Sequence, residues 1–108
     1  MEIIYDKLVR DKIPEIIKKD GETPYIRILS TEEYWEYLLK KDQEELEEVR
    51  LATSSKEVLK ELADKLELLS SMAELHGYTL EDIIDQMLVK RSKNGGFRER
   101  ILLEKVVK

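Results

Sequence analysis

Five carboxylates stand in two short runs whose spacing suits metal binding. Glu44, Glu45 and Glu48 form the first run, and Glu61 and Asp64 follow after twelve further residues. On a helix, residues three apart share one side and lie one turn from each other. Carboxylate oxygens without cysteine or histidine are the ligands that Mg²⁺ or Mn²⁺ prefers. The spacing therefore predicts a divalent-cation site built from two neighbouring helices.

The acids fall on the faces that should pack. At about 100° per residue, Glu45 lies about 20° from Leu38, and Glu61 lies about 20° from Leu68. A carboxylate on a packing face is costly unless it is paired or bound to a cation. A merely solvated acidic face is the alternative, and it is common on Glu-rich helices. The placement favours metal binding, and the expected ligands are Glu45, Glu48, Glu61 and Asp64.

Helix-start signals place the elements that carry these acids. A hydroxyl residue followed three positions later by an acid predicts a capping box, and this pattern occurs at Ser30, Ser54 and Thr79. The predicted helices span residues 31–52, 55–76 and 80–92. Gly77 is a suitable stop for the second of them.

The remaining segments give weaker signals. Pro14 to Lys19 predicts a short first helix, because proline suits a first turn. Tyr25 to Leu29 is compatible with a short extended segment. Gly95 and Gly96 interrupt the chain before a tail, residues 97–107, whose conformation the pattern leaves open. The sequence therefore predicts a single all-α domain over residues 1–108.

The composition excludes several classes of protein. The chain has 108 residues, 42% of them hydrophobic and 40% charged, with a net charge of −5 and no cysteine. Disulfides, thiolate catalysis and thiolate metal sites are excluded. An acidic balance disfavours a general nucleic-acid binder, and no apolar run is long enough to cross a membrane. We expect a soluble, cytoplasmic protein that works without nucleic acid or membrane.

Basic residues gather towards both ends of the chain. Two roles are open for these cations: they either contact phosphate or are ordinary surface residues. The candidates for phosphate contact are Lys7, Arg10, Lys90, Lys93 and Arg98. Gly95 and Gly96 would let the backbone approach an anion closely. The only histidine, His76, stands at a predicted helix end, where a cation is favoured. Trp35 is expected in the core or at a dimer interface.

Three segments together resemble a known family. The acidic pattern resembles the EExxE…ExxD signature of the MazG-like all-α nucleoside triphosphate pyrophosphatase superfamily. The run Tyr5–Glu15 is similar to the opening of its compact branch, which is labelled phosphoribosyl-ATP pyrophosphohydrolase-like or predicted house-cleaning. Lys90–Phe97 is similar to that branch's KRGGF-type tail. The resemblance implies an all-α helical bundle built on a long antiparallel helix hairpin, assembled as a homodimer or a dimer of dimers.

The resemblance also implies an activity. Members cleave the α–β phosphoanhydride of nucleotides with Mg²⁺, for which Mn²⁺ can substitute, and release a nucleoside monophosphate and pyrophosphate. The matching catalytic residues are Glu44, Glu45, Glu48, Glu61 and Asp64. Of these, all but Glu44 match the metal ligands of the family. Glu44 matches an acid that supports the ligands or orients the attacking water. Lys41 matches a lysine that contacts phosphate.

The substrate is less defined than the reaction. Residues 50–55, between the two acidic runs, carry no obvious base-reading side chain. We expect house-cleaning of non-standard nucleoside triphosphates. The alternatives are hydrolysis of phosphoribosyl-ATP in histidine biosynthesis, and a non-catalytic helical dimer that binds metal or nucleotide.

Overall fold

The computed structural model describes all 108 residues and contains four helices and no strand. The helices are α1 (Ile13–Lys19), α2 (Thr31–Leu51), α3 (Ser55–Leu75) and α4 (Leu80–Asn94). The all-α prediction is confirmed, and each helix boundary lies within two residues of its expected position. The segment Tyr25–Leu29 and the tail after Gly95 form neither helix nor strand.

Local hydrogen bonds explain where the long helices begin. The Ser30 hydroxyl accepts from the backbone N–H of Glu33, whose carboxylate accepts in return from the Ser30 N–H, and α4 begins the same way. The capping box predicted at Ser54 forms only in part. Ser54 accepts from the Glu57 N–H, but the Glu57 carboxylate accepts from both the N–H and the hydroxyl of Thr53.

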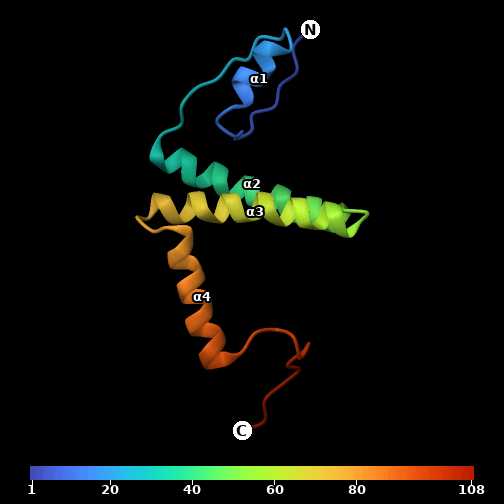
Figure 1. Cartoon of the computed structure of the whole chain (residues 1–108), viewed down its shortest axis with the longest axis vertical. Coiled ribbons are helices and arrows are strands. Elements are labelled where there is room, and N and C mark those ends of the chain that lie inside the picture. The colour runs from blue at the N-terminus through green and yellow to red at the C-terminus, as the bar shows by residue number, and fades with distance from the viewer.

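Helices α2 and α3 form an antiparallel hairpin joined by residues 52–54 (Figure 1). Leu38 lies inside it and is the one fully buried side chain. Lys65 of α3 donates a 2.7 Å hydrogen bond to Asp42 of α2, which ties the two helices together. Gly77, with a φ of 84°, ends α3 in the left-handed conformation that glycine adopts without strain.

The other two helices lie apart from the hairpin. Helix α1 packs on no other helix, and α4 packs on α3 alone. Figure 1 shows α4 leaving the end of α3 and running away from the hairpin, with α1 on the opposite side. None of the four helices is both long and apolar enough to cross a membrane.

The single chain exposes far more surface than a compact protein of its size. Its accessible area is 10318 Å², whereas a folded monomer of this mass exposes about 6,300 Å². Its radius of gyration is 18.3 Å, against about 13 Å for a compact domain of this length. Many of the exposed side chains are large and apolar.

Candidate divalent-metal site

Two helices bring three of the predicted acids together. Glu45 projects from α2, and Glu61 and Asp64 project from α3. The short loop between these antiparallel helices places Glu45 beside Glu61 and Asp64. One oxygen from each of the three carboxylates lies within 4.8 Å of the other two. This is a group of hard oxygen ligands of the kind that a divalent cation binds.

Glu45 lies in the least favourable environment of the three. Its Oε2 atom is buried and has no hydrogen-bond partner. Burial, and then the neighbouring carboxylates of Glu61 and Asp64, raise the pKa of Glu45 to about 6. A bound divalent cation would give this oxygen a partner and favour the charged form of the carboxylate. The residues present therefore fit Mg²⁺ or Mn²⁺.

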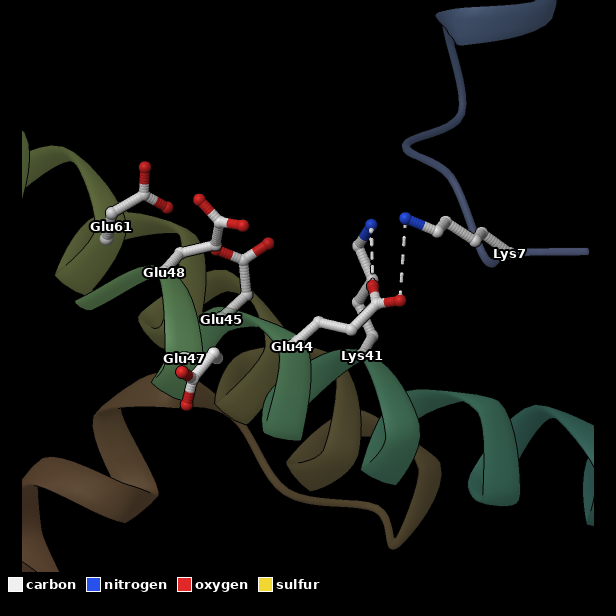
Figure 2. A pocket seen from close by; sticks show the side chains of 7 residues that line it. All are labelled: Lys7, Lys41, Glu44, Glu45, Glu47, Glu48 and Glu61. Atoms are coloured by element: carbon white, nitrogen blue, oxygen red, sulfur yellow. Dashed lines mark ion pairs between the residues drawn. The ribbon is translucent and has the colours of Figure 1, made fainter. Parts of the chain in front are cut away.

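A wider pocket surrounds the acids. Its cavity volume is about 390 Å³, and every residue that lines it is charged: Lys7, Lys41, Glu44, Glu45, Glu47, Glu48 and Glu61. Figure 2 shows the carboxylates of Glu45, Glu48 and Glu61 gathered at one end. At the other end, Glu44 lies 3.6 Å from Lys7 and 3.5 Å from Lys41. The pocket thus has an acidic end and an end that carries two cations.

Glu48 does not join the close group. It lines the pocket, but it is exposed and lies outside the three carboxylates that approach within 4.8 Å. The close group therefore contains three of the four predicted ligands, and the assignment of Glu48 as the fourth stays a prediction. The two helices differ here: Glu48 lies about 80° from Leu38 round α2, at the edge of the packing face, whereas Asp64 lies only about 40° from Leu68 round α3.

The basic residues near the start of the chain do reach the site. Arg10 donates a 2.8 Å hydrogen bond to Oδ1 of Asp64, and Lys7 pairs with Glu44. They were predicted to contact phosphate, and here they contact carboxylates. The three C-terminal cations do not line the pocket; Lys90 and Lys93 are exposed on α4, and Arg98 is exposed in the tail.

Two pairings escaped the sequence analysis. Lys65 pairs with Asp42 and not with the acids of the close group. Helical periodicity could have predicted this pair, because both residues lie on the same flank of the hairpin. The Trp35 ring meets His76 edge-on, with centroids 4.8 Å apart. This contact joins α2 to the end of α3, away from the acidic pocket.

Comparison with known proteins leaves the family open. No protein-family model matches the chain, and no solved structure matches it. An uncharacterized protein of Mycolicibacterium smegmatis is 54% identical over 46 residues, which cover 43% of this chain and 47% of that protein. The match thus spans about half the length of this relative.

We expect the metal-free protein to lose stability as the pH rises through about 6. The pKa of Glu45 is about 6 when folded and near its ordinary value of 4.5 when unfolded. Between these values the folded state binds more protons, so the stabilisation is fully present below pH 4.5 and disappears above pH 6. Thermal melts from pH 4.5 to 7.5 in chelator would show the fall. Glu45→Gln should flatten it, and a wild-type melting temperature that does not fall over this range would contradict the assignment.

Proposed function

We propose that the protein is a Mg²⁺-dependent nucleoside triphosphate pyrophosphohydrolase of the MazG-like type, which cleaves the α–β phosphoanhydride to a nucleoside monophosphate and pyrophosphate. The observation that supports this most is the group of Glu45, Glu61 and Asp64. One buried oxygen in that group lacks a partner, and two lysines lie at the other end of the same pocket. A structural acidic face would need neither feature.

The arrangement suits phosphoryl chemistry. Such reactions depend on charge neutralisation and positioning more than on a covalent nucleophile. A divalent ion held by Glu45, Glu61 and Asp64, with Glu48 at the edge, would polarise the phosphates and lower the pKa of a bound water. Lys7 and Lys41 would contact the outer phosphates. Glu44, which pairs with both lysines, would position them.

The pocket also bears on the substrate. Its lining contains no hydrophobic residue, so it offers no surface on which a particular base would stack. We therefore favour house-cleaning with broad base tolerance, in which non-standard nucleoside triphosphates are cleaved alongside standard ones because recognition is mainly through the triphosphate. The test is kcat/KM for pyrophosphate release across standard and non-standard nucleoside triphosphates and phosphoribosyl-ATP. We expect values within about tenfold across the bases, since little discrimination is available without base contacts.

Two other outcomes of that panel would overturn this choice. A sharp preference for phosphoribosyl-ATP would place the enzyme in histidine biosynthesis. Tight nucleotide binding without pyrophosphate release would instead identify a non-catalytic nucleotide sensor or a metal-stabilised helical dimer.

We also propose that the chain works as a homodimer, or as a dimer of dimers. The single chain exposes about 4,000 Å² more than a compact monomer of its mass. Obligate dimers bury about 2,000–5,000 Å² in total, which is half as much per protomer. The excess is therefore large enough to supply such an interface.

The surface for this contact is a set of half-exposed leucines, which we call the leucine face. Its members, each 38–48% exposed, are Leu39 and Leu46 of α2 and Leu62, Leu66 and Leu69 of α3. On each helix these leucines lie about 80–160° round from the residue at the centre of the packing face, which is Leu38 on α2 and Leu68 on α3. The direction is towards the side that carries the Asp42–Lys65 bond. Glu44 lies about 120° round in the opposite direction. Association through the leucine face would therefore leave the acidic pocket open.

A further inference from the structure

The N-terminal segment reaches the acidic pocket through two cations. Lys7 pairs with Glu44 at 3.6 Å. Arg10 pairs with Asp64 at 2.8 Å, and these two residues are 54 positions apart in the sequence. Leu8 is half-buried, and the other apolar side chains of this segment are at least 42% exposed. Because α1 packs on no other helix, the following helix does not fix the segment against the hairpin.

Asp64 consequently has two competing roles. It is one of the three carboxylates whose oxygens converge, and it also accepts the hydrogen bond from Arg10. A divalent ion held at Asp64 would stand a few ångströms from the guanidinium, and the two positive charges would repel each other. Arg10 and a metal ion therefore each reduce the affinity of Asp64 for the other.

We propose that Arg10 and the metal ion exchange at Asp64. In the metal-free protein, Arg10 neutralises Asp64 and so limits the repulsion within the acidic group. When the ion binds, Arg10 leaves Asp64, and its planar guanidinium then binds a phosphate group of the incoming nucleotide in a bidentate manner. This inference rests on the metal site of the proposed function, and it gives Arg10 a second partner and a reason to change partners.

The opposite role for Arg10 makes an opposite prediction. If Arg10 kept its bond to one oxygen of Asp64 while the other bound the ion, it would orient the ligand. Its removal would then weaken metal binding. If Arg10 competes with the ion, its removal must strengthen metal binding. The sign of the change in affinity separates the two roles.

The experiment is calorimetric titration of Mn²⁺ into wild type, Arg10→Gln and Lys12→Gln. Lys12 is the matched control, because it is an exposed cation of the same segment that forms no ion pair. We expect Arg10→Gln to bind Mn²⁺ about two- to fivefold more tightly, the scale of a partly exposed ion pair. Lys12→Gln should match wild type.

A second titration follows the phosphate side of the exchange. The probe is α,β-methylene-ATP, added to protein saturated with Mg²⁺, because it resists cleavage at the proposed bond. Arg10→Gln should bind it more weakly than wild type, although it binds the metal more tightly. A merely structural role would not move the two affinities in opposite directions.

The outcomes separate this inference from the proposed function. If wild type binds Mn²⁺ and Arg10→Gln binds it equally well or more weakly, the exchange is overturned and the metal site stands. Equal strengthening in Lys12→Gln would also overturn it, since bulk charge would then explain the effect. Absence of Mn²⁺ binding by wild type would remove both the site and the exchange.

Discussion

Replacing Glu61 by glutamine should abolish pyrophosphate release from nucleoside triphosphates. The substitution preserves the shape of the side chain but removes the charge of one of the three converging carboxylates. Mutation of groups that merely support a metal ligand costs 10–100-fold in metal affinity or activity, so the loss of a ligand should cost about a hundredfold or more. Steady-state kcat at saturating Mg²⁺ measures the effect.

The same variant should change the response of stability to metal. Mg²⁺ should raise the melting temperature of wild type, because an ion that binds only the folded state stabilises it by mass action. Glu61→Gln should lose this response, and its metal-free form should melt higher than wild type because one of the mutually repelling charges is gone. Full activity in Glu61→Gln would refute the site.

Glu67→Gln provides the control for this variant. Glu67 lies on the same helix and is exposed, but it points about 120° away from Glu61. It carries the same change of charge, and it should alter neither the activity nor the metal response. An equal loss of activity in both variants would mean that the acids act only through bulk negative charge.

The leucine face should hold two copies of the chain together. We expect light scattering coupled to gel filtration at micromolar concentration to give at least twice the 12.8 kDa of one chain. The double variant Leu62→Glu, Leu69→Glu should raise the dissociation constant at least about a hundredfold, since it removes four half-exposed leucines from a two-fold interface and burial of the exposed part of each contributes about 0.7 kcal/mol or more. Circular dichroism would report whether the helices persist.

A leucine on the other side of the hairpin supplies the matched control. Leu51 is 65% exposed and lies about 140° from Leu38 on the side of Glu44. Leu51→Glu introduces the same chemical change and should leave the assembly intact. A wild-type protein that stays folded and monomeric at micromolar concentration would contradict the proposed interface.

The helices were predictable because their determinants are local. A hydroxyl residue and an acid three positions later satisfy the orphan N–H groups of a first turn, as Ser30 and Glu33 do. The convergence of Glu45 and Glu61 was also predictable, because helical periodicity places both on packing faces that a hairpin must bring together. The short connection between the helices leaves few other arrangements.

The rest of the site depends on longer-range geometry. Glu48 shares the spacing of the other ligands, yet it stands at the edge of the interface, and periodicity of about 100° per residue is too coarse to separate an edge from a centre. The Arg10–Asp64 bond spans 54 positions, and no local rule determines which carboxylate a distant cation will reach. A dimer was expected from the family resemblance, but the leucine face could be defined only once the Asp42–Lys65 bond showed which flank of each helix carries it.

We expect this acidic pocket to cleave nucleotides between the α and β phosphates with a divalent ion. Phosphorus NMR of a reaction containing the protein, Mg²⁺ and a nucleoside triphosphate tests it most directly. We predict that the signals of the triphosphate give way to those of pyrophosphate and a nucleoside monophosphate, and that chelator stops the reaction. Release of inorganic phosphate with a nucleoside diphosphate, or an unchanged spectrum for every nucleotide tried, would contradict it.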